Sequence, residues 1–464
     1  MIRKARRALR PYQREAYRWA GDAGHAALFL DMRLGKTLTT IRRCHAFRPR
    51  DPWMGFRGVV FAPGSALEGW ESDLNAEGVA YTTLAGLTPQ ERAMAFRRAA
   101  DPTAAPGWVL ANKELWQTDV ADEIASFPWD AVVADESHFL KNPAAQVTKW
   151  FLKRFRSVPH RYILTGTPCP EGEHEYVCQM LWLRGSFMGC ETFWKWRMRF
   201  MRPDPRGFGW AVRPEAVPKI RKEVARAAFI LRRSDAGLDV PKIRERRELV
   251  LPPKLRREYR RIEDEFEADT VDGELRTTQW SGEKYVWLRR AASGFDPDGN
   301  LQWPGKLNAL RDLADGELAR DRFVVWANFR AEIDAIASAL GRRAAWADGR
   351  LSVADRKKTV AAWRRTRNGI LVMQPAIGKT GMNLSAADTA IYFSLPPGLE
   401  AYQQTQDRIV LPGKNGVLLV FLLTKGTVDK DLYHALTGKR LRAGASFSEI
   451  LREQFEQRRS RCRR

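Results

Sequence analysis

The sequence is poor in cysteine and histidine. It has five cysteines and six histidines in 464 residues, and no two cysteines form a Cys-x-x-Cys pair. Three of the cysteines and one histidine lie between Cys169 and Cys190, but their spacing fits no common zinc module. An odd number of thiols without a disulfide framework favours a reducing compartment.

Long apolar runs are also absent from the sequence. No stretch has the length needed to cross a bilayer. The basic first ten residues are not followed by the apolar core of a signal peptide. These features argue against a membrane-spanning or secreted protein, and we expect a soluble, cytoplasmic one with no membrane partner.

Acidic residues are too few to balance the basic ones. The chain has 78 Lys and Arg against 55 Asp and Glu, which gives a net charge of +23. This excess favours a nucleic acid as partner, because counterion release and long-range attraction both strengthen binding to a polyanion. The alternative is a basic soluble protein with no nucleic-acid role. The length and the apolar fraction of 44% allow two or three domains with sizeable cores.

One short stretch carries the signature of a phosphate-binding loop. An apolar strand, Ala26–Leu30, leads through a tight turn into a helix that starts at Gly-Lys-Thr. Backbone N–H groups and the positive helix end face an anion, Lys36 reaches the β- and γ-phosphates, and the Thr37 hydroxyl can bind Mg²⁺. An ordinary strand-to-helix turn is the alternative. The residues assigned to the nucleotide here are Arg33, Leu34, Gly35, Lys36 and Thr37.

Two further segments of the first half suggest parts of the same site. Gln13 stands beside an aromatic residue at the start of an amphipathic helix, where its side chain can contact an adenine edge. The alternative is that this segment is only a helix N-terminus with Pro11 at its start. The apolar strand 129–134 ends in Asp135 and Glu136. Asp135 can hold Mg²⁺ through water, and Glu136 can orient the attacking water or take its proton.

Strands and helices alternate in both halves of the chain. Short apolar strands separated by helical patterns predict parallel sheets, with the functional residues at the carboxyl ends of the strands. The predicted fold class is α/β, with two nucleotide-fold lobes and a mainly helical insertion between them. The predicted strands are 26–30, 58–63, 108–112, 129–134, 161–168, 322–327, 369–373, 389–393 and 416–422.

The ordered motifs resemble those of superfamily two helicases, most closely the Swi/Snf-type branch with its DEAH-like box. In the first half they are Leu9–Gln13, Asp31–Thr37, Phe61–Ser65, Ala111–Leu115, Asp135–His138 and Leu164–Pro168. In the second half they include Gly305–Lys306, the block 378–384 and Gln404–Arg408. The resemblance implies a RecA-like first lobe at 1–235 with a helical protrusion from about 170, a helical connector at 236–300, a second RecA-like lobe at 301–440 and a basic tail at 441–464.

The same resemblance implies an ATPase that uses ATP and Mg²⁺ and moves on double-stranded DNA as a monomer. The sequence is similar to the compact, stand-alone members of this branch from bacteria and their viruses. It implies that Gly381, Asp407 and Arg408 contact the nucleotide, with Arg408 as the arginine finger. Leu411 departs from the family pattern, which has a second arginine there. This departure keeps one alternative open, a weakly hydrolysing, ATP-switched clamp on DNA or protein. The basic charge leaves a third possibility, an RNA-directed helicase.

The middle of the chain has a different composition. The stretch 193–202 interleaves Trp and Phe with Lys and Arg. Such a pattern can stack on bases and bind phosphates. It can equally be a buried helix with an exposed arginine face.

Overall fold

The computed structural model divides the chain into two compact units, Met1–Leu238 and Asp239–Arg464, which are described separately. No helix within the described ranges is long and apolar enough to cross a membrane. The predicted C-terminal tail, 441–464, falls outside the residues that the structure describes. The structure describes residues 7–49, 51–53, 55–169, 172–203, 210–265, 267–269, 275–277, 281–376, 382–411 and 414–438.

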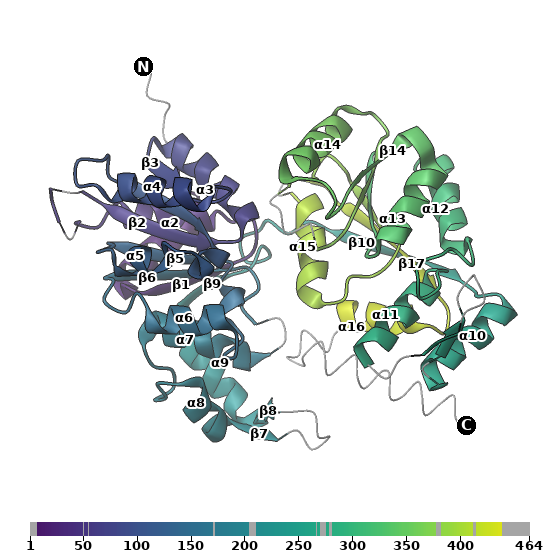
Figure 1. The fold of residues 1–464 in the computed structure, drawn as a ribbon, viewed down its shortest axis with the longest axis horizontal. Helices are drawn as coiled ribbons and strands as arrows, with labels where there is room; N and C mark the ends of the chain where they lie inside the picture. Colours follow the sequence, from purple (N-terminus) through teal and green to yellow (C-terminus); the bar gives the residue numbers. More distant parts are fainter. Residues whose placement is uncertain are drawn as a thin grey trace. The chain divides into compact units, whose positions relative to one another are not determined.

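The first unit is built on a seven-stranded sheet in which all neighbouring strands are parallel (Figure 1). Parallel strands end at the same edge, so the loops that follow β1, β5 and β6 meet there. The strands, in spatial order, are β3 (Ala80–Thr83), β4 (Gly107–Asn112), β2 (Arg57–Ala62), β5 (Ala131–Asp135), β6 (His160–Leu164), β1 (Ala26–Leu30) and β9 (Ala228–Leu231).

Both faces of this sheet are buried, which explains the continuous apolar strands. Ala26, Leu28 and Leu30 face one core with α1 (Pro11–Ala23), α2 (Lys36–Cys44) and α3 (Gly64–Glu77). Ala27 and Phe29 face the other core. The helices that contribute to this second core are α4 (Pro89–Ala100), α5 (Ala121–Ser126), α6 (Gln146–Lys153), α7 (Tyr176–Arg184), α8 (Phe193–Phe200) and α9 (Val217–Ala225).

The last part of the first unit, called the protrusion below, contains three helices and a short hairpin. Helices α7, α8 and α9 lie there with a short antiparallel hairpin of β7 (Met201–Pro203) and β8 (Trp210–Val212) (Figure 1). Helix α8 divides the aromatic and basic stretch between two environments. Phe193 and Trp196 are buried, whereas Trp194 and Met198 are exposed.

The second unit is built on a six-stranded parallel sheet. Helices α12 and α13 cover one face, and α14, α15 and α16 pack on the other. The predicted fold class, two α/β lobes with parallel sheets, is confirmed. The elements are β10 (Lys242–Leu249), β17 (Val417–Thr424), β16 (Thr389–Tyr392), β13 (Phe323–Trp326), β15 (Ile370–Met373), β14 (Ala344–Ala347), α12 (Gly305–Asp315), α13 (Arg330–Leu340), α14 (Val353–Arg365), α15 (Leu399–Ile409) and α16 (Val428–Thr437).

The segment predicted as a helical connector, 236–300, begins with a strand instead. Strand β10 pairs with β17 over its whole length and forms one edge of the second sheet. Its sequence, Lys-Ile-Arg-Glu-Arg-Arg-Glu-Leu, lacks the apolar run of the central strands because an edge strand tolerates charged side chains. The rest of the segment contains α10 (Pro253–Glu265), the hairpin of β11 (Glu267–Asp269) and β12 (Leu275–Thr277), and α11 (Ser281–Ala292).

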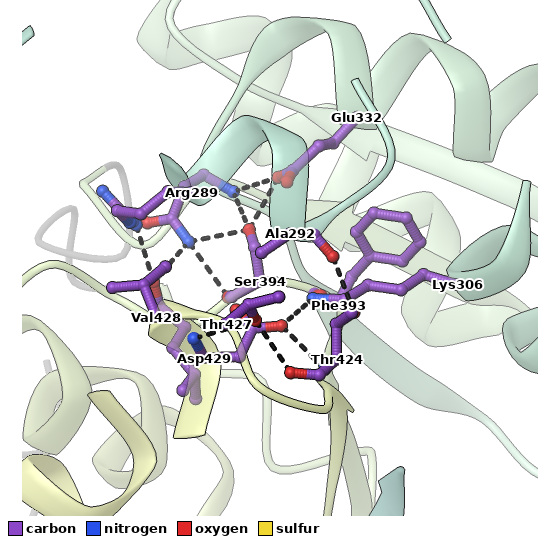
Figure 2. A network of polar contacts seen from close by, with 12 residues as sticks. Arg289, Ala292, Lys306, Glu332, Phe393, Ser394, Thr424, Thr427, Val428 and Asp429 are labelled. Atoms are coloured by element: carbon purple, nitrogen blue, oxygen red, sulfur yellow. Dashed lines mark hydrogen bonds and ion pairs between the residues drawn. The ribbon is translucent and has the colours of Figure 1, made fainter. Parts of the chain in front are cut away.

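A buried ion pair fastens several elements of the second unit together (Figure 2). Lys306 Nζ lies 2.7 Å from Asp429 Oδ2 and donates to the Phe393 carbonyl at 3.0 Å. The same Asp429 oxygen accepts from the backbone N–H of Thr424, whose hydroxyl donates to the Ala292 carbonyl. Helices α11, α12 and α16 are thus joined to the ends of β16 and β17.

Candidate active site

The loop between β1 and α2 has the backbone shape of a phosphate cradle. Gly35 has φ of +80° and Arg33 has φ of +69°, both in the left-handed region. A Cβ on Gly35 would also collide with the amide of Gln13. Glycine is therefore favoured at position 35 for two reasons, its backbone conformation and the lack of space beside Gln13.

Lys36 and Thr37 form the first turn of α2, where backbone N–H groups lack helical partners. The Lys36 side chain is buried, and its ammonium group donates to the Leu30 carbonyl at 2.8 Å. It therefore lies folded over the loop. Leu34 is fully buried and anchors the loop to the core below α2. Thr37 remains half-buried at the helix start.

Gln13 connects helix α1 to this loop. Its Oε1 accepts from the Arg10 backbone N–H at 2.9 Å, and its Nε2 donates to the Leu34 carbonyl at 3.0 Å. The side chain is almost fully buried. In the structure Gln13 supports the loop from below; its contact with an adenine edge stays a prediction.

Asp135 ends β5 at the same edge of the sheet and is held on both carboxylate oxygens. Oδ2 accepts from the indole N–H of Trp70 and Oδ1 from the backbone N–H of Glu136, each at 2.8 Å. Burial and the charge of Glu136 raise the pKa of Asp135 to about 6, against the opposing effects of Lys36 and the Trp70 hydrogen bond.

Glu136 adopts a left-handed backbone conformation, with φ and ψ both at +50°. This conformation is unfavourable for a residue with a side chain, and it aims the carboxylate differently from a residue continuing the strand. Its Oε2 accepts from the Thr165 hydroxyl at 3.4 Å and lies 3.5 Å from His138 Nδ1. The second carboxylate thus lies against the end of β6 and the start of the following 3₁₀ turn.

Two residues that support the site were not assigned to it from the sequence. Trp70, fully buried in α3, is the donor to Asp135. Arg233, also buried, follows β9; its backbone N–H donates to Asp31 Oδ2 at 2.9 Å and its Nε to the Met32 carbonyl at 3.1 Å. Both contacts join segments far apart in the sequence, so no local pattern could reveal them.

The remaining predicted residues belong to the second unit. Arg408 and Asp407 lie in the last turn of α15; Arg408 is buried and its carbonyl accepts from the Leu384 N–H at 3.1 Å. Leu411 follows this helix and is half-buried. Gly381 lies outside the described residues. The roles of Asp407 and Arg408 toward a nucleotide stay predictions.

The residues of the first unit fit a nucleoside triphosphate with a divalent cation. The cradle offers backbone donors and one buried ammonium group, which suits phosphate oxygens. Each oxygen of Asp135 makes one hydrogen bond in the structure and has a second lone pair for a cation or its bound water. The backbone N–H groups, the Lys36 ammonium group and the Asp135 carboxylate are therefore the groups expected in an enzyme that binds and hydrolyses a nucleotide.

Comparison with known proteins identifies the class. A family model described as the SNF2-related domain matches residues 12–268, and one described as the helicase conserved C-terminal domain matches residues 305–412. The first match covers more than half of the chain, and the chain belongs to the SNF2-related family. The predicted enzyme class, an ATPase, is confirmed with it.

Individual relatives are distant in sequence. A SWI/SNF-related matrix-associated actin-dependent regulator of chromatin subfamily A-like protein 1 from Xenopus tropicalis is 23% identical over 93% of this chain and 44% of its own length. The TATA-binding protein-associated factor mot1 of Aspergillus fumigatus is 23% identical over 91% of this chain and 26% of its own length. The chain thus spans less than half of these two relatives.

Two further matches extend the comparison. The ATP-dependent DNA helicase DDM1 of Arabidopsis thaliana is 23% identical over 90% of this chain and 59% of its own length. The solved structure described as Sulfolobus solfataricus SWI2/SNF2 ATPase core in complex with dsDNA aligns with a TM-score of 0.45 at 18% identity, covering 94% of this chain and 92% of that one.

Proposed function

We propose that the protein is an ATP-driven motor that couples hydrolysis to movement along double-stranded DNA. The observation that carries this proposal is the meeting of a phosphate loop and an Asp-Glu pair at one edge of the first sheet. The net charge of +23 favours a polyanionic track. The names of the relatives, a regulator of chromatin and a DNA helicase, support DNA as that track.

The residues of the first unit divide the chemistry among them. Lys36 and the N–H groups of the α2 start bind the β- and γ-phosphates. Thr37 and Asp135 would hold Mg²⁺, which when bound neutralises phosphate charge. Glu136 orients the attacking water and accepts its proton, since its carboxylate is held beside Asp135 by Thr165 and His138.

The second unit supplies the proposed arginine finger. Arg408 offers a guanidinium group that can meet the γ-phosphate charge in the transition state. Lys414, which follows this helix, is the alternative candidate in this unit; its Nζ lies 2.7 Å from Asp388 Oδ1 and 2.6 Å from the Ala387 carbonyl.

Leu411 favours a second candidate function, an ATP-switched clamp that hydrolyses slowly. An aliphatic side chain at this position cannot stabilise phosphate charge. The two candidates differ in the response to Leu411→Arg. For a motor, the parent already hydrolyses ATP rapidly with DNA and the added arginine raises the rate modestly. For a clamp, the parent hydrolyses ATP only slowly and the substitution raises turnover strongly.

The decisive experiment is a steady-state ATPase assay without nucleic acid and with duplex DNA, single-stranded DNA and RNA. A motor on duplex DNA is expected to be stimulated most by duplex and to displace a third strand from a triplex as it moves. Duplex affinity should fall log-linearly with salt and depend little on sequence, because phosphate contacts dominate. Equal stimulation by RNA, or a flat salt response, would contradict the proposal.

A further inference from the structure

Three large exposed apolar side chains gather on the protrusion of the first unit. The exposed fractions are 53% for Trp194, 65% for Met198 and 36% for Trp210. Trp194 and Met198 lie on α8, and Trp210 starts strand β8 of the adjacent hairpin. The opposite side of α8 carries Phe193 and Trp196 into the core, so the orientation of the exposed side is fixed.

Arg197 joins the two exposed indoles. Its guanidinium carbon lies 4.5 Å from the ring centroid of Trp194 and 4.4 Å from that of Trp210. The three side chains therefore form a cation–π sandwich, named here the Trp194–Arg197–Trp210 stack. A stack of this kind holds both indoles in place before any ligand arrives, which lowers the entropy lost on binding.

The surroundings of the stack are basic. Among the described residues, Arg197 forms no ion pair with a carboxylate, and its guanidinium group lies against two indole rings. Successive residues of an α-helix are rotated by about 100° around its axis. The order of residues around the exposed side of α8 is therefore Arg197, Trp194, Met198, Lys195 and Arg199. The acidic neighbour, Glu191, pairs with Lys195 at 3.1 Å on the open surface, where such a pair is weak.

Rigid aromatic faces flanked by cations suit a nucleic-acid strand better than an apolar protein surface. Bases stack on aromatic rings while Lys and Arg contact the phosphates between them. A duplex hides its base faces inside the helix, so a stacking contact requires an unpaired base. The protrusion thus offers a type of contact that the duplex-binding motor does not need.

We propose that the Trp194–Arg197–Trp210 stack is a second nucleic-acid site, which binds unpaired bases of DNA. The inference rests on the proposed function only in taking DNA as the partner. It adds a preference for DNA with a single-stranded segment. It also assigns this preference to a surface made of residues that take no part in nucleotide binding.

The test compares binding of three fluorescent probes to the full chain: an oligothymidine, a blunt duplex and the same duplex with a single-stranded extension. Trp194→Ala is expected to weaken oligothymidine binding about 5- to 150-fold, the usual contribution of one aromatic stacking partner. Blunt-duplex affinity and duplex-stimulated ATPase should change less than about twofold. Trp194→Phe should retain most of the affinity for the oligothymidine, because a ring remains.

Trp53 provides a matched control, since it is 96% exposed in the same unit and lies outside the stack. Trp53→Ala should bind all three probes like the parent. Unchanged oligothymidine binding in Trp194→Ala, or an equal loss for all probes, overturns the proposal. An oligouridine arm separates DNA from RNA, and tighter uridine binding would reassign the site to RNA.

The same experiment separates failure of the site from failure of the motor proposal. If no nucleic acid stimulates ATP hydrolysis but Trp194→Ala still loses oligothymidine, the motor proposal fails and the stack stands. If duplex stimulates hydrolysis while Trp194→Ala binds every probe like the parent, the stack fails and the motor proposal stands.

Discussion

The buried pair of Lys306 and Asp429 allows the clearest quantitative prediction. The two side chains are 0% and 4% exposed, so neither charge can be solvated by water when its partner is removed. In Lys306→Met the carboxylate of Asp429 stays in the core with the Thr424 N–H as a remaining donor. Removing one partner of a buried pair costs about 3–5 kcal/mol.

This cost predicts a large shift in the unfolding of the second unit. For a domain of about 150–250 residues, 1 kcal/mol corresponds to roughly 2–4 °C in Tm, so Lys306→Met should lower the Tm of this unit by about 6–20 °C. The double variant Lys306→Met/Asp429→Leu should recover a good part of the loss, because it removes both charges. Asp429→Leu is the second single variant. The change in unfolding free energy of the double variant, minus the sum of the changes in the two single variants, gives the coupling energy.

The assay is thermal and urea unfolding of the full chain, with the transition of the second unit followed by calorimetry. Lys254→Met is the matched control: Lys254 is 83% exposed and lies 3.9 Å from Glu258 on the same helix, an arrangement that contributes about 0.3–0.5 kcal/mol. The reasoning is refuted if Lys306→Met unfolds like Lys254→Met. The reasoning is also refuted if the double variant is no more stable to unfolding than the less stable of the two single variants.

The other predictions concern the chemistry. Lys36→Ala should lose both ATP binding and hydrolysis, whereas Glu136→Gln should keep ATP bound and lose hydrolysis; equal loss of binding in titrations of the two would contradict the assigned roles. Because the pKa of Asp135 is raised to about 6 and the ionised form is needed for a cation, kcat/KM should fall as the pH drops through this range. Trp70→Phe removes a hydrogen bond that lowers this pKa, so the acidic limb of the pH profile should move to higher pH. Arg408→Ala should lower DNA-stimulated turnover about 10³-fold or more with little change in ATP binding, as measured by parallel rate and binding assays.

The first unit was predictable where the signal is local. The strand, turn and helix around Lys36 are contiguous, and so are the strand and acidic pair at Asp135. Parallel strands then bring the two segments to one edge of the sheet without further information. Trp70 and Arg233 could not be assigned because their contacts span 65 and 202 residues of sequence. Only the packing of α3 and the pairing of β9 with β1 place them.

The second unit shows a different limit of sequence reasoning. Strand β10 carries charged residues at most positions, since it forms an edge and has a single neighbouring strand. Continuous apolar runs identify strands that are buried on both faces, and this edge strand does not meet that condition. The boundary between the units therefore lies before β10, rather than after the helices that follow it.

Arg233 lies close in sequence to this boundary and contacts the phosphate loop. Arg233 is bonded to Asp31 and Met32 of the phosphate loop, and the second unit begins only a few residues later at Asp239. We predict that a displacement of the chain at Asp239 acts on the phosphate loop through a short covalent path and these two hydrogen bonds. A change in the loop on binding phosphate is expected to act along the same path in the opposite direction. Such a connection from the predicted nucleotide site to the second unit does not require an arginine finger.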